Sequence, residues 1–103
     1  MEDAHHNRVK VEIFGTEYTL RGDASSQHMR QVAQRVDRLM AAISSAIPHL
    51  DERRVAVLSA VNMADELIQT ENKLEQLQAQ YEKLEKEHRE LLELLDEQTR
   101  QSN

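Results

Sequence analysis

The sequence predicts an α+β fold in which an N-terminal β-hairpin and a short helix pack on a long C-terminal helix that extends as a coiled coil. Three observations support this fold class. Apolar and polar residues alternate between Val9 and Ile13, which is typical of a half-buried strand. Apolar residues then recur at steps of three and four between Met29 and Ile43, as on one face of a helix. After Pro48 the chain contains no glycine or proline that would interrupt a helix.

The hairpin is expected to turn at residues 15–16, a two-residue turn that begins with glycine and suits a tight hairpin. In the register that follows, Val11 faces Leu20, and the apolar side chains of both strands share one face. Phe14 then faces Glu17 and points away from that face. Because a lone hairpin is unstable in water, we expect its apolar face to be covered.

A first helix is predicted to begin at Ser25 or Ser26, either of which offers an N-cap. One side of this helix is the apolar stripe, and polar and charged residues fill the other side. Pro48 ends the helix, because the residue before a proline avoids the helical conformation.

Asp51 is placed to cap a second helix, which continues to about Glu97. At 1.5 Å per residue this helix would be roughly 70 Å long, so it must protrude from a globule of this size. Between Val55 and Ile68 its apolar residues spread over more than one face. One face is available to cover the hairpin and the first helix, and the remainder requires a second chain.

Further along, the apolar stripe narrows into heptads, which predicts a coiled coil at residues 69–98. The steps alternate between three and four from Ala60 to Leu95, and only Thr70 and His88 interrupt the apolar seam. Four leucines within five residues near the end broaden the seam, which favours a homotetramer built from dimers. Charge does not decide between parallel and antiparallel pairing. The residues expected to carry self-association are Leu67, Leu74, Leu77, Tyr81, Leu84, His88, Leu91, Leu92, Leu94 and Leu95.

The chain is therefore expected to contain four segments. Residues 1–7 form a disordered leader, 8–68 a small α/β head, 69–98 the coiled-coil oligomerisation region and 99–103 a frayed tail. The polar N-terminus lacks the apolar stretch of a signal peptide, and no apolar run approaches the length of a membrane span. We expect a cytoplasmic protein without membrane contact.

Composition argues against several classes of function. Cysteine is absent, so there is neither a thiol nucleophile nor a cysteine-based zinc site. The net charge of −6 arises entirely from residues 51–103, and no basic face suited to nucleic acid is evident. Phosphate-binding and hydrolase motifs are missing, and so few loops offer little material for a pocket. We expect no enzyme activity, no catalytic residue, no cofactor and no nucleic-acid partner.

Two histidine features have more than one interpretation. His5 and His6 lie beside acidic residues, but a leader without packing does not preform a metal site, so no metal is expected. His88 lies in the seam, where protonation would bring like charges together and act as a pH switch. We favour instead a tolerated polar residue that helps to fix the register, as single polar seam positions do.

Three features of the chain occur together in one known family: Ile-Phe-Gly at residues 13–15, a helix that ends before Pro48, and LSAVNMADEL at residues 58–67 before a coiled coil. In these features the chain resembles the ZapA family of bacterial cell division proteins, from about Val9 to Ile68. The resemblance implies a small α/β head on a long helix, and dimers that join into tetramers through the coiled coil. It also implies binding to FtsZ, the tubulin-like GTPase of the mid-cell division ring, and cross-linking of its filaments.

The surface that would contact FtsZ is expected among the exposed cations of the head, since FtsZ is expected to be acidic and cations would steer association. These residues are Arg30, Arg35, Arg38, Arg53 and Arg54. The alternative is a solvated helix surface without a partner.

Two other functions remain open at the level of sequence. A prefoldin-like chaperone subunit also combines a hairpin with coiled-coil helices, but it places the hairpin between two long helices, and here the hairpin precedes both. An adaptor of the same architecture with another client is the second alternative.

Overall fold

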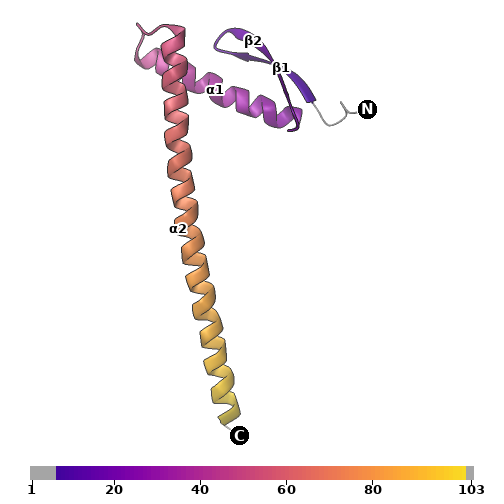
Figure 1. Cartoon of the computed structure of the whole chain (residues 1–103), viewed down its shortest axis with the longest axis vertical. Coiled ribbons are helices and arrows are strands. Elements are labelled where there is room, and N and C mark those ends of the chain that lie inside the picture. Colours follow the sequence, from indigo (N-terminus) through magenta and orange to yellow (C-terminus); the bar gives the residue numbers. More distant parts are fainter. Residues whose placement is uncertain (1–6, 102–103) are drawn as a thin grey trace. The chain divides into compact units, whose positions relative to one another are not determined.

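The computed structural model describes residues 7–101 and confirms the predicted fold class. The chain divides into two compact units, Met1–Met63 and Ala64–Asn103. The elements, labelled in Figure 1, are β1 (Asn7–Ile13), β2 (Thr16–Gly22), α1 (Ser26–Ala46) and α2 (Glu52–Gln101). The sequence-based boundary at residue 68, and the pairing of residues 69–98 as a coiled coil, stay predictions.

Strands β1 and β2 form an antiparallel hairpin whose turn lies one residue earlier than predicted. The turn residues are Phe14 and Gly15, with φ angles of 51° and 82°. Positive φ at both central positions is expected of a type I′ turn, whose twist matches that of a hairpin. Val11 therefore pairs with Tyr18 and not, as predicted, with Leu20. The apolar face is nevertheless the predicted one, because moving a partner by two residues keeps its side chain on the same side of the sheet.

Helix α1 lies against β1, and the core of the head forms between them (Figure 1). The alternation in β1 turns two valines inward, and the stripe of α1 supplies the facing side chains. The buried cluster is Val9, Val11, Met29 and Ala33, with the half-buried Ile13, Leu20 and Ala24 packed around it. Full burial of each large aliphatic side chain contributes about 1.5–3 kcal/mol.

Polar contacts hold the hairpin at both ends. At its base, Asn7 Nδ2 donates to the carbonyl oxygen of Ala24 at 2.8 Å. At its tip, the backbone N–H of Phe14 donates to Asp37 Oδ1 on α1, also at 2.8 Å. Asn7 belongs to β1 and not to the leader, so the strand begins one residue earlier than the sequence indicated. Residues 1–6 lie outside the described residues.

The predicted N-cap of α1 and its predicted end before Pro48 are confirmed. The Ser25 hydroxyl accepts from the backbone N–H of His28 at 3.1 Å, which satisfies one of the unpaired donors of the first turn. The helix ends at Ala46, and Ile47 is its C-cap, immediately before Pro48.

Helix α2 begins at Glu52, as predicted. Asp51 caps it, since its Oδ1 accepts a hydrogen bond from the backbone N–H of Arg54 at 2.8 Å. Val55 is fully buried and Ser59 is 3% exposed. The Ser59 hydroxyl donates to the Val55 carbonyl oxygen at 2.8 Å, so its burial leaves no unpaired donor. The helix continues to Gln101, and residues 99–101 of the expected frayed tail are therefore helical.

Candidate interaction surfaces

The five arginines predicted to contact a partner do not form one patch. Arg30 lines a groove between β1 and α1 together with Lys10. Arg35 lines a second groove, together with Met63 of α2. Arg38 is exposed on α1. The remaining two arginines lie at the start of α2.

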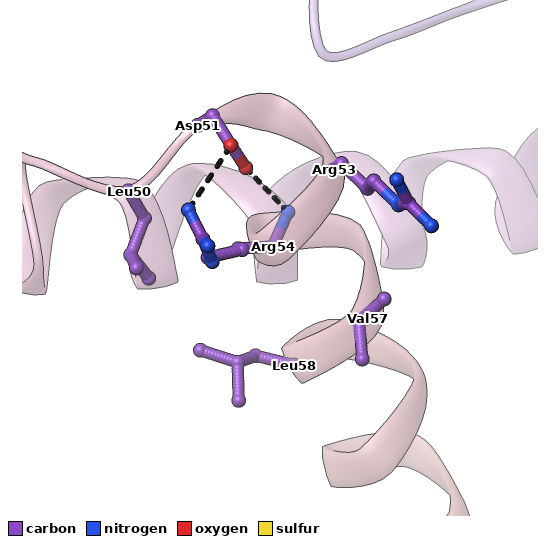
Figure 2. A pocket seen from close by; sticks show the side chains of 6 residues that line it. All are labelled: Leu50, Asp51, Arg53, Arg54, Val57 and Leu58. Carbon is purple, nitrogen blue, oxygen red and sulfur yellow. Dashed lines mark hydrogen bonds and ion pairs between the residues drawn. The ribbon is translucent and has the colours of Figure 1, made fainter.

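The start of α2 combines two guanidinium groups with exposed apolar side chains. The lining residues, shown in Figure 2, are Leu50, Asp51, Arg53, Arg54, Val57 and Leu58. Arg54 folds back to Asp51, with Nη1 3.3 Å from Oδ2, whereas Arg53 extends away from that carboxylate. Both partners of the ion pair are well exposed, so it contributes at most about 1 kcal/mol. Val57 is 56% exposed and Leu58 39%, which makes the groove amphipathic.

The apolar surface left open on α2 is larger than the sequence indicated. We expected one face of residues 55–68 to cover the hairpin and the first helix. In the structure α1 covers the hairpin, and within the described part of α2 only Val55 and Ser59 are buried. Val61, which follows Ser59 closely in the same helix, is 60% exposed. Single exposed apolar residues are common, but a continuous set of them marks an interaction surface.

The residues predicted to carry self-association are all exposed on the single chain, and each of the apolar members is 52–65% exposed. They are Leu67, Leu74, Leu77, Tyr81, Leu84, His88, Leu91, Leu92, Leu94 and Leu95. Most helical stability in proteins comes from packing of an apolar face, and this face has no cover within the described chain. The pairing of these residues between chains stays a prediction.

The outer face of the hairpin carries a charge pattern that was not predicted from the sequence. Arg8 lies directly opposite Arg21, and Glu12 lies directly opposite Glu17. All four side chains are exposed. Side chains in such positions start about 5 Å apart at Cβ, so each like-charged pair is unfavourable. The misplaced turn concealed this pattern, because the predicted register would have set Arg8 opposite Asp23.

Metal and membrane sites find no support in the part of the chain that the structure describes. No group of three His, Cys, Asp or Glu residues between 7 and 101 is placed to hold a metal ion. His5 and His6, where a metal site was considered and not expected, lie outside the described residues. Of the helices within that same range, none has the length and apolar character needed to cross a membrane.

Comparisons with known proteins agree with this architecture. The family model described as "Cell division protein ZapA" matches residues 9–99. The cell division protein ZapA of Bacillus licheniformis is 39% identical over 80 residues, which cover 78% of this chain and 94% of that protein. Its counterpart in Bacillus pumilus is 40% identical over 85 residues, covering 82% and 92%.

Two solved structures are similar as well. A ZapA mutant dimer from Geobacillus stearothermophilus matches with a TM-score of 0.61 at 38% identity, over 74% of this chain and 88% of that one. A structure described as an unknown conserved bacterial protein from Pseudomonas aeruginosa PAO1 matches with a TM-score of 0.59 at 26% identity. That match covers 87% of this chain and 97% of the other.

Proposed function

Because this chain belongs to the ZapA family of cell division proteins, we propose that it is a non-enzymatic accessory protein that binds FtsZ. In this proposal it cross-links FtsZ filaments at the cytoplasmic mid-cell division ring. We name FtsZ as the partner because the resemblance to the ZapA family implies it. The observation that carries the proposal is a compact head continued by a 50-residue helix whose apolar seam is exposed on the single chain.

Self-association of α2 is the first requirement of this function. Full burial of a Leu side chain contributes about 1.5–3 kcal/mol, and the seam residues are already partly covered by their own helix. Burying the rest of the eight Leu side chains and Tyr81 would contribute on the order of 10 kcal/mol per chain. Two chains together would then offset a cost of association of about 4–15 kcal/mol. The dimeric structure neighbour supports pairing of chains, and a homotetramer is the assembly that we propose.

Cross-linking is the second requirement. An assembly with two or more heads turns the second contact with a filament into an intramolecular event, which raises overall affinity without any new contact. The head contacts are proposed at the five arginines Arg30, Arg35, Arg38, Arg53 and Arg54. Because the five arginines lie in separate places, each place needs its own charge-reversal variant. If Arg35→Glu together with Arg38→Glu leaves FtsZ binding unchanged, that part of α1 is not the contact.

Sedimentation of GTP-polymerised FtsZ with and without the protein, followed by electron microscopy of the pellet, tests the proposal. We expect co-pelleting and thick bundles. The double variant Leu91→Glu, Leu95→Glu should lose both the oligomer and the bundles, yet retain binding by single heads. Asn72→Glu with Ala79→Glu is the matched control, because it adds the same charge at positions outside the seam.

Failure of this test also has a defined meaning. A protein that is shown to be oligomeric, but neither pellets with FtsZ nor changes its filaments, would have another client. Capture of unfolded polypeptides by the isolated protein would then favour the chaperone alternative.

A further inference from the structure

We propose that Arg8 and Arg21 form a carboxylate-binding pair through which the outer face of the hairpin contacts an acidic surface of the FtsZ filament. This inference rests on the proposed function and names a contact site that the predicted set of arginines did not include. The outer face is defined by the exposed side chains of Arg8, Lys10, Glu12, Glu17, Thr19 and Arg21.

The hairpin register brings the two guanidinium groups together. Arg8 on β1 and Arg21 on β2 are direct cross-strand partners, so their side chains leave the same face from Cβ atoms about 5 Å apart. Both are exposed, and neither takes part in an ion pair within residues 7–101. Each guanidinium presents several N–H donors in a planar fork, and a carboxylate accepts such a fork with two oxygens.

The backbone beneath this pair is fixed in place. Val9, adjacent to Arg8, is 4% exposed, and its partner Leu20, adjacent to Arg21, packs on the same core. The hydrogen bond from Asn7 to the loop before α1 anchors the strand end at 2.8 Å. A partner would therefore meet two arginines whose strands are already ordered, which lowers the entropic cost of binding.

The arrangement also works against the stability of the hairpin. Arg8 opposes Arg21 and Glu12 opposes Glu17, whereas exchanging residues 17 and 21 would turn both pairs into attractive ones with the same composition. Local choices that oppose folding are expected at functional sites, where another requirement sets the residue. A carboxylate between the two arginines would relieve their repulsion, so the bound state removes a cost that the unbound head carries.

The hairpin provides its own matched control. In the variant Arg8→Thr, Arg21→Thr the arginine pair is replaced by residues that favour strands, and in Glu12→Thr, Glu17→Thr the acidic pair is replaced in the same way. Both variants remove one like-charged pair from the same face. If neither pair contacted FtsZ, both variants would melt at or above the temperature of the wild type and bind FtsZ equally well.

The test measures co-sedimentation with GTP-polymerised FtsZ over a range of salt concentrations, beside thermal unfolding at one fixed protein concentration. We expect the arginine variant to melt at or above the temperature of the wild type, but to lose about tenfold in FtsZ affinity and most of its salt dependence. The acidic-pair variant should bind like the wild type. Arg8→Lys with Arg21→Lys keeps the charges without the planar fork and should recover only part of the loss.

Several outcomes would overturn the inference. If the arginine variant pellets with FtsZ like the wild type, the pair is not a contact. If it melts well below the wild type, the two arginines are needed for folding and the loss of binding has a structural cause. If the wild type itself does not pellet with FtsZ, the proposed function fails and the inference fails with it.

Discussion

Replacing Asp37 with alanine should release the tip of the hairpin from α1. The Asp37 carboxylate accepts the backbone N–H of Phe14 at 2.8 Å in a partly buried contact between residues 23 apart in the chain. A hydrogen bond to a charged group contributes about 1.5–3 kcal/mol. Alanine favours the helix over aspartate by about 0.6 kcal/mol, and this gain offsets part of the loss. The expected net loss in the free energy of unfolding is therefore about 1–2 kcal/mol.

Thermal unfolding followed by circular dichroism measures this loss. Protein concentration must be held constant, because association contributes to the apparent stability. For a domain of this size we expect the melting temperature to fall by about 5–10 °C. Asp37→Asn keeps an oxygen acceptor without the charge, so its effect should be smaller. Asp65→Ala is the matched control: it makes the same change on an exposed helix, where the carboxylate accepts from Gln69 at 2.8 Å.

If Asp37→Ala lowers the melting temperature no more than Asp65→Ala does, the Asp37 carboxylate does not stabilise the hairpin tip. Hydrogen exchange provides a second, local readout. The Phe14 amide should exchange slowly in the wild type and quickly in Asp37→Ala, while amides in the middle of α1 stay protected. A Phe14 amide that already exchanges quickly in the wild type would show that the carboxylate does not hold the tip.

Three further predictions concern single side chains. Val55→Ala should cost about 2 kcal/mol, because Val55 is fully buried, and an unchanged denaturation midpoint would contradict its place in the core of the head. Asp51→Ala should cost about 1 kcal/mol through loss of the N-cap of α2, seen as a lower melting temperature; no change would mean that the cap is dispensable. His88→Leu should tighten self-association measured by sedimentation equilibrium, because a polar seam residue weakens a coiled coil; weaker association would place His88 outside the seam.

The elements of the fold were predictable because their signals are local. Alternation identifies β1, and a stripe with steps of three and four identifies α1. The helix starts were equally accessible: Ser25 and Asp51 each accept a hydrogen bond from a backbone N–H three residues later, so both donor and acceptor stand within one short window of sequence.

The turn was not predictable in this way. Local rules place glycine first in the turn, because a bulky residue at positive φ is strained, and Phe14 has a φ of 51°. In the structure Phe14 occupies the first turn position, and its backbone N–H donates to the carboxylate of Asp37 on α1. Because these two residues lie far apart in the chain, the residues around the turn do not predict the hydrogen bond between them.

This one-residue error affects the core and the surface of the hairpin differently. Moving each cross-strand partner by two residues keeps Val11 on the inner face whether it meets Tyr18 or Leu20, so the predicted core survives. Charge pairing has no such tolerance, because the same shift replaces Asp23 by Arg21 opposite Arg8 and turns an attractive pair into a repulsive one. A register must therefore be known to the residue before the surface of a hairpin is interpreted. For the same reason, the arginines selected by helix charge alone proved to be scattered over the head, while the pair that the sheet brings together was overlooked.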